Sequence, residues 1–188
     1  TRAAIPWAIA LQQFNLLGSH DTGRILSLLG GNPGLLQAAV TLLLTYVGVP
    51  SIYYGDEVGL RDDPALGSRG CMPWDPERWN PDVLALYRGL IGLRRASPAL
   101  QRGGYQTLLV EADALGYVRA TTEDQVLVLV HRGAQPRPAG VIPVRHAGVP
   151  DGAPFVEHFS GVRATVTAGG LPVPELSEGA QIWRNASP

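Results

Sequence analysis

The sequence lacks lysine altogether and holds a single cysteine, Cys71, among its 188 residues. One thiol cannot form an internal disulfide or a thiolate metal cluster, so cysteine usage implies no oxidising compartment. All 15 basic residues are arginines, and 16 acidic residues bring the net charge to −1 without any block of like charge. This balance argues against nucleic acid and against a membrane as partners.

Histidine is scarce as well, and the spacing of the four present is not that of metal ligands. They are His20, His131, His146 and His158. We therefore expect no metal and no other cofactor in this chain. A calcium site would need a set of oxygen ligands that the sequence does not bring together.

Long apolar runs are also few. Residues Leu35 to Tyr54 carry no charge over a length that could cross a bilayer, but Gly48-Val49-Pro50 interrupts them. A helix followed by a buried strand fits this run better. The first eleven residues superficially resemble a short signal peptide, yet one basic residue and a proline-broken apolar stretch favour a helical turn.

The hydrophobic share of 45% is enough for a packed core, and the length suits one domain or two small ones. The first half predicts alternating strands and helices, which is typical of parallel-sheet folds. The expected elements are a strand over 14–18, a helix from Asn32 to about Tyr46, a strand over 51–54, and a helix from Pro81 to Arg95 capped by Asn80.

After Ser97-Pro98 the pattern changes to short apolar runs separated by Gly, Pro and Asp, which predicts an antiparallel β-sandwich. The predicted strands cover residues 105–110, 115–120, 125–131, 141–144, 155–158, 164–167 and 180–183. The boundary falls near residues 97–104, so we assign residues 1–98 to one domain and 99–188 to a second.

The most informative motif is Gly-Ser-His-Asp-Thr-Gly-Arg, from Gly18 to Arg24, which directly follows the apolar run Phe14 to Leu17. A strand that ends in a His-Asp pair delivers two polar side chains to the carboxyl end of a sheet, where α/β barrels carry out their chemistry. Alone, this dipeptide is a weak signal, because Asp21 could cap the following turn and His20 could pack in a core.

Two further motifs follow in order: Thr45 to Leu60 (TYVGVPSIYYGDEVGL) and Ser68 to Asp75 (SRGCMPWD). Together the three resemble the α-amylase family of glycoside hydrolases, particularly its cyclomaltodextrinase, neopullulanase and maltogenic amylase branch. In that resemblance they are the seventh strand, the eighth strand and the Arg-x-x-Met-x-Trp element. The family usually has proline at the position of Gly23.

The resemblance implies an α/β plus all-β fold: the last two β/α units of a TIM (β/α)8 barrel, followed by a C-terminal antiparallel β-sandwich. Two units cannot close an eight-unit barrel, and they would leave strand edges unpaired. We therefore expect a C-terminal piece of a larger enzyme whose N-terminal barrel portion is its first partner. The resemblance also allows a homodimer of the whole enzyme and a cytoplasmic location, the latter consistent with the lack of a usable signal.

The implied activity is retaining hydrolysis of α-glucosidic bonds in maltodextrins, cyclodextrins, maltooligosaccharides or related α-glucans. Such enzymes need a nucleophile and an acid/base carboxyl, and the family carries these after its fourth and fifth strands, outside this sequence. Asp21 matches the family's third catalytic carboxylate, and His20 matches a substrate-binding histidine. Arg24 is expected either to contact substrate or to brace a carboxylate. The chain alone should be inactive.

Two other functions stay open from the sequence: a non-catalytic amylase-like subunit that binds carbohydrate or a partner, and an independent sandwich with an α/β arm. Asp56 and Glu57 are adjacent, so on an extended backbone they point to opposite faces, and we expect a structural role for them.

Aromatic side chains could stack on sugar rings, but Tyr53 and Tyr54 are expected to pack the barrel. Trp74 and Trp79 are equally suited to a substrate rim and to holding a loop together. Cys71 is expected to be a small buried residue rather than a nucleophile.

Overall fold

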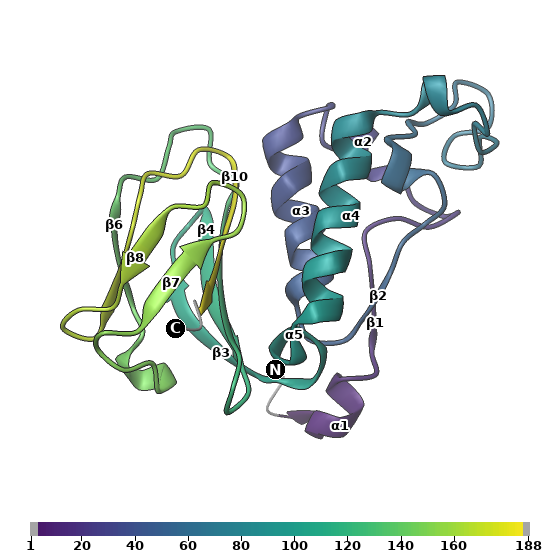
Figure 1. The fold of residues 1–188 in the computed structure, drawn as a ribbon. Helices are drawn as coiled ribbons and strands as arrows, with labels where there is room; N and C mark the ends of the chain where they lie inside the picture. Colours follow the sequence, from purple (N-terminus) through teal and green to yellow (C-terminus); the bar gives the residue numbers. More distant parts are fainter. Residues whose placement is uncertain (1–3, 186–188) are drawn as a thin grey trace. The chain divides into compact units, whose positions relative to one another are not determined.

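The computed structural model describes residues 4–185, and the chain divides into two compact units, Thr1–Ala96 and Ser97–Pro188 (Figure 1). Each unit is described by itself. Within the described residues, no helix is both long enough and apolar enough to cross a membrane. The helical turn expected near the start is α1 (Trp7–Ala10), while residues 1–3 lie outside the described range.

The first unit is built on two parallel strands, β1 (Phe14–Leu16) and β2 (Val49–Ser51). Helices α2 (Ile25–Leu28) and α3 (Pro33–Thr45) form the crossover between them. After β2 come two short 3-10 helices, η2 (Asp56–Val58) and η3 (Pro76–Arg78), and then the long helix α4 (Pro81–Ala96), which lies beside α3 (Figure 1). The predicted order of strands and helices is confirmed.

Side-chain caps explain where the two long helices begin. The Asn32 side chain accepts a hydrogen bond from the amide of Leu35 (3.0 Å), and Pro33 occupies the first turn, where no donor is needed. Asn80 accepts hydrogen bonds from the amides of Asp82 and Val83 (3.1 and 3.2 Å). Both starts are those that the sequence predicts.

The second strand is not where the sequence predicts it. It covers 49–51 rather than 51–54, because pairing already starts where the Val49 amide donates to the Gln13 carbonyl (2.8 Å). Pro50 is accommodated because a two-stranded sheet has open edges on which a missing donor is tolerated. Residues 52–54 therefore begin a loop, and so do residues 17–18 after the shorter β1.

The second unit begins with the short helix α5 (Pro98–Arg102), capped by the Ser97 side chain. Two antiparallel sheets follow: six strands in the order β3-β4-β5-β10-β7-β8, and the pair β6-β9. Their bounds are β3 Gly104–Val110, β4 Ala114–Ala120, β5 Gln125–His131, β6 Gly140–Pro143, β7 Pro154–Glu157, β8 Arg163–Thr165, β9 Gly170–Val173 and β10 Gly179–Asn185. A 3-10 helix, η4 (Arg145–Ala147), follows β6.

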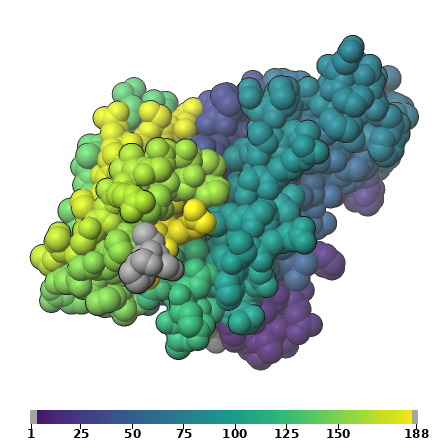
Figure 2. Space-filling view, in the orientation of Figure 1, coloured from purple at the N-terminus to yellow at the C-terminus, as the bar shows by residue number. Residues whose placement is uncertain are grey.

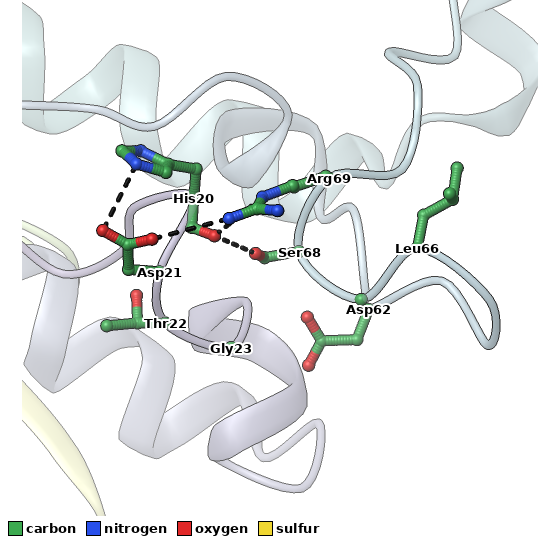
Figure 3. A pocket seen from close by; sticks show the side chains of 9 residues that line it. His20, Asp21, Thr22, Gly23, Asp62, Leu66, Ser68 and Arg69 are labelled. Atoms are coloured by element: carbon green, nitrogen blue, oxygen red, sulfur yellow. Dashed lines mark hydrogen bonds and ion pairs between the residues drawn. The ribbon is translucent and has the colours of Figure 1, made fainter.

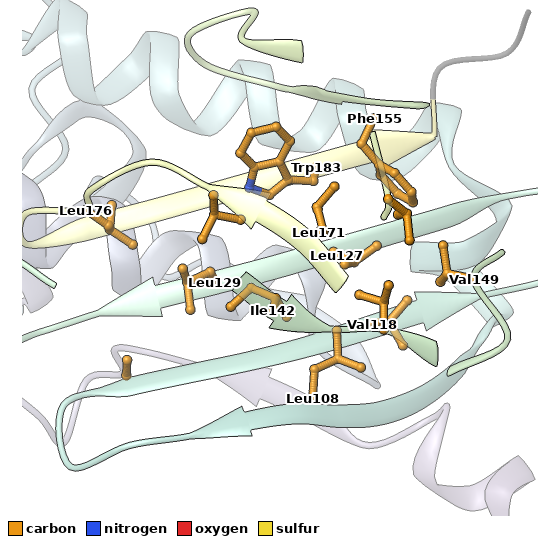
Figure 4. Packing of buried hydrophobic residues seen from close by; sticks show 14 residues of the cluster. Leu108, Val118, Leu127, Leu129, Ile142, Val149, Phe155, Leu171, Leu176 and Trp183 are labelled. Carbon is orange, nitrogen blue, oxygen red and sulfur yellow. The ribbon is translucent and has the colours of Figure 1, made fainter. Parts of the chain in front are cut away.

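All seven predicted runs are strands, and β9 is an eighth that the sequence analysis missed. Its central Pro172 and its leading Gly170 hide the signal, since both residue types are depleted in strands. The two sheets share one core, in which Trp183 and Phe155 from the large sheet lie near Leu171 and Ile142 from the small one (Figure 4). Two antiparallel sheets around a common core make a β-sandwich.

Candidate active site

Two loops form the site, and both follow the carboxyl ends of the parallel strands β1 and β2. The loop of residues 17–24 follows β1, and the loop of residues 52–80 follows β2. The second projects away from α3 and α4 as an irregular excursion (Figures 1 and 2). Because the strands are parallel, their carboxyl ends meet, which brings residues from separate motifs together.

A pocket of about 370 Å³ lies between these two loops (Figure 3). The first loop contributes His20, Asp21, Thr22 and Gly23, and the second contributes Asp62, Leu66, Gly67, Ser68 and Arg69. The pocket therefore joins the first sequence motif to the third.

The loop that carries His20 and Asp21 folds on its own polar groups. The Ser19 amide donates to Thr22 Oγ1 (2.9 Å), and the Asp21 amide donates to Ser19 Oγ (3.2 Å). This tight turn leaves the side chains of His20 and Asp21 67% and 71% exposed. The alternative in which His20 packs in a core is therefore wrong, because its side chain is exposed at the pocket.

The Asp21 carboxylate lies between two nitrogen donors (Figure 3). Its Oδ2 is 3.2 Å from His20 Nε2, and its Oδ1 is 3.5 Å from Arg69 Nη2. Arg69 also donates from Nε to the His20 carbonyl (3.2 Å), to which Ser68 Oγ donates as well (3.3 Å). These contacts tie the first loop to the second.

Arg69 is a site residue that the sequence analysis did not single out. It opens the Arg-x-x-Met-x-Trp element, and that element was the available signal. Its distance from Asp21 along the chain concealed the contact, because only the parallel pairing of β1 and β2 places the two loops side by side.

Arg24 does not line the pocket. Its guanidinium is fully buried, and Nη1 donates to the Tyr54 carbonyl and to Asp56 Oδ1 (3.1 Å). The guanidinium carbon lies 4.4 and 4.5 Å from the ring centres of Tyr53 and Tyr54. Of the two roles expected for Arg24, this geometry fits the brace on a carboxylate.

Asp56, the acceptor of that brace, is 4% exposed. Burial raises the pKa of its carboxyl to about 6, although the bond and charge of Arg24 act in the opposite direction. The nearby carboxylates of Glu57 and Asp62 add to the rise. Asp56 is thus a buried partner of Arg24 and does not line the pocket, which agrees with the structural role predicted for the Asp-Glu pair.

The aromatic residues of the long loop differ in their exposure and in their partners. Trp79 donates from Nε1 to the Pro73 carbonyl (2.6 Å) and so holds the loop together, whereas Trp74 is 81% exposed. Tyr54 donates its hydroxyl to the Gly70 carbonyl (2.8 Å). Tyr53 and Tyr54 pack on Arg24 and on each other, with ring centres 4.7 Å apart.

Cys71 is exposed, so the expectation of a buried filler is wrong. Its neighbour Gly70 is buried instead and lies close to Asp63. The segment is neither helix nor strand, so no regular periodicity predicts which of its residues are buried. As for metals, residues 4–185 contain no group of three or more His, Cys, Asp or Glu side chains that could hold an ion.

Comparison with known proteins shows what this chain is similar to. Residues 6–80 match the alpha amylase catalytic domain. A cyclomaltodextrinase from a Bacillus species is 39% identical over 131 residues, which are 69% of this chain and 24% of that protein. The maltogenic alpha-amylase of Bacillus acidopullulyticus is 39% identical over 123 residues, 63% of this chain and 21% of the relative.

A solved cyclomaltodextrinase structure covers 96% of this chain with a TM-score of 0.82 at 31% identity, and this chain covers 30% of it. The chain thus spans about a quarter of the length of the curated relatives it matches. It belongs to the α-amylase family. Within that family it groups with the cyclomaltodextrinases, maltogenic amylases and neopullulanases, of which neopullulanase 2 of Thermoactinomyces vulgaris is 36% identical over 135 residues.

Proposed function

We propose that this chain forms part of a retaining glycoside hydrolase that cleaves α-glucosidic bonds of maltodextrins, cyclodextrins or related α-glucans. The observation that carries the proposal is the exposed Asp21 carboxylate, held between His20 and Arg69 in a pocket at the carboxyl ends of two parallel strands. The names of the relatives, cyclomaltodextrinase and maltogenic alpha-amylase, support the substrate class.

In this proposal the residues 1–98 are the last two β/α units of a (β/α)8 barrel, and residues 99–188 are its C-terminal sandwich. The open sheet of the first unit supports this. Phe14, Leu16 and Val49 are 73%, 54% and 42% exposed, and β1 and β2 pair only with each other among the described strands. Apolar strand edges of this kind need a covering element, which an N-terminal barrel portion would supply.

Three polar groups of the pocket would each have a task in such a reaction. Cleavage of a glycosidic bond builds positive charge on the sugar ring, and the Asp21 carboxylate would stabilise that charge more in the transition state than in the ground state. His20 would donate to sugar hydroxyls beside it. Arg69 would hold Asp21 in position through its 3.5 Å contact.

The isolated chain should not turn over substrate, because the nucleophile and the acid/base of the family lie before its seventh strand. Asp62, the other carboxylate of the pocket, accepts a hydrogen bond from the Arg24 amide (2.9 Å), which suits loop closure better than attack on a sugar. For location we propose the cytoplasm, supported by the relative named intracellular maltogenic amylase of Bacillus subtilis, 32% identical over 123 residues.

The proposal is tested by measuring the size of the polypeptide that carries this sequence in its source cells, and by assaying it and the 188-residue chain on a maltooligosaccharide. We expect the cellular polypeptide to be far larger than 20.0 kDa and to release sugar. We expect the 188-residue chain to release none. A cellular polypeptide of 20 kDa with no carbohydrate turnover, alone or with a partner chain, would refute the enzyme and favour a non-catalytic subunit.

A further inference from the structure

One buried carboxylate touches both ends of the loop that carries His20 and Asp21. Asp56 Oδ1 accepts the hydrogen bond from Arg24, at the end of that loop. On its other side, Asp56 Oδ2 lies so close to Gly18, where the loop begins, that a methyl group on Gly18 would stand 2.9 Å from it. Asp56 therefore lies at the base of the loop, and a side chain on Gly18 would displace its carboxylate.

Arg24 links Asp56 to Asp62, a residue that lines the pocket. The Arg24 amide donates to Asp62 Oδ1 (2.9 Å). The Asp62 amide in turn donates to Ser27 Oγ (2.8 Å). The Arg24 side chain is pinned by the Tyr54 carbonyl as well as by Asp56. A displacement of Asp56 would thus be transmitted to both loops that line the pocket.

The groups that face Asp56 come from three elements. Arg24 faces it from the first loop, and Glu57 and Asp62 act on it from the second. The third is α4, whose Tyr87 has a hydroxyl pKa raised by burial and, to a smaller extent, by the charges of Asp56 and Glu57. An ion pair that served stability alone would lower the pKa of its carboxyl. Burial instead raises the pKa of Asp56 to about 6, so the ionised form costs folding free energy.

We propose that Asp56 is a positioning residue for Asp21: it holds Gly18 and Arg24 at the two ends of the loop and so sets where the catalytic carboxylate stands in the pocket. The inference rests on the proposed function, since it gives Asp56 a task in the reaction assigned to Asp21. It differs from a merely structural role in that loss of Asp56 should lower kcat only where Asp21 is present.

The test is a double-mutant cycle in the full polypeptide that carries this sequence, with kcat, KM and the melting temperature measured for each variant. The variants are Asp56→Asn, Asp21→Asn and their combination. Gly18→Ala is a second probe, because it keeps every charge and displaces the Asp56 carboxylate sterically. Asp113→Asn is the matched control, since it removes an Asp–Arg pair of similar length (Arg132, 3.3 Å) that is exposed and far along the chain from the pocket.

We expect Asp56→Asn and Gly18→Ala each to lower kcat by about 10- to 100-fold, the range typical of a displaced catalytic group, with a much smaller change in KM. In the Asp21→Asn background the same changes should alter kcat by no more than about two-fold, because the group they position is already gone. Asp56→Asn should also lower the melting temperature, because the buried Arg24 guanidinium loses its counter-charge, so kcat is compared at a temperature where every variant is folded. Asp113→Asn should resemble wild type.

An unchanged kcat in Asp56→Asn and Gly18→Ala, or an equal loss in both Asp21 backgrounds, would overturn the positioning role while leaving the proposed function in place. Wild-type kcat in Asp21→Asn is a different result: it would refute the proposed function itself, and the positioning role with it.

Discussion

Asp21 and Arg69 meet in the pocket, with 3.5 Å between Oδ1 and Nη2, although they belong to different motifs and to loops that follow different strands. The pair is exposed, at 71% for the Asp21 side chain and 63% for that of Arg69. Exposed pairs contribute little to folding, so we expect the contact to matter for the placement of Asp21 rather than for stability.

Arg69→Gln should therefore lower kcat of the full polypeptide on maltooligosaccharides by about 10-fold while leaving the melting temperature unchanged. Steady-state kinetics and a thermal melt check both parts. Arg132→Gln, which removes an arginine from the exposed pair with Asp113, is the matched control and should retain wild-type kcat. If Arg69→Gln lowered the free energy of unfolding by as much as it raised the activation free energy of the reaction, this account would be contradicted.

The raised pKa of Asp56 predicts a dependence of stability on pH. The folded protein binds this proton more tightly than the unfolded chain, with pKa values of about 6 and 3.8. The contribution of Asp56 to the free energy of unfolding is therefore largest below pH 3.8 and falls as the pH rises through about 6. Asp63 acts oppositely: the amides of Ala65 and Leu66 lower its pKa, so its contribution is lost as the pH falls below its ordinary range.

Urea unfolding of wild type and Asp56→Asn between pH 4 and 7.5 isolates the Asp56 effect as a difference. We expect wild type to lose stability relative to the variant as the pH rises through this window, and no further change above it. Parallel curves for the two proteins would show that Asp56 does not titrate in the folded state as its burial implies.

The second unit depends on a few large side chains that both sheets share. Trp183 is 1% exposed in β10 and belongs to the core that Leu171 of β9 and Ile142 of β6 complete. Trp183→Ala should destabilise this unit by about 3–5 kcal/mol, the usual cost of deleting a buried aromatic side chain. Chemical denaturation followed by circular dichroism would measure the loss, and an exposed tryptophan provides the control, since Trp74→Ala should cost far less.

Much of this fold could be predicted from the sequence where local signals are strong. Caps at Asn32 and Asn80 mark the helix starts, and alternating apolar runs mark seven strands of the sandwich. The bounds of β2 and the existence of β9 could not be predicted. Each of these strands contains a proline, which local rules exclude from strands but which long-range pairing on an open edge accepts.

The site could be predicted in part. His20 and Asp21 are adjacent in one motif, so their shared exposure at the end of a strand follows from local sequence. The contact of Asp21 with Arg69 and the burial of Arg24 on Asp56 depend on how two separate loops meet, and no local pattern reports that. Cys71 was misjudged for the same reason, since burial inside an irregular loop is decided by its tertiary contacts.

The exposure of Cys71 gives a simple prediction for the folded protein. As the single thiol of the sequence, it should react with a thiol-specific reagent such as dithiobis-nitrobenzoate in native buffer, giving one equivalent without denaturant. The 188-residue chain is the right sample, and Cys71→Ser should abolish the signal. Reaction only after addition of denaturant would contradict the placement of this loop.

The central claim is that Asp21 takes part in cleaving an α-glucosidic bond, and the most direct measurement is kcat of the full polypeptide with Asp21→Asn on a maltooligosaccharide. The substitution keeps the shape of the side chain and removes its charge. The account predicts a fall in kcat of about 10²- to 10³-fold, typical of losing a group that stabilises transition-state charge, with the melting temperature unchanged. A variant that retains wild-type kcat would contradict it.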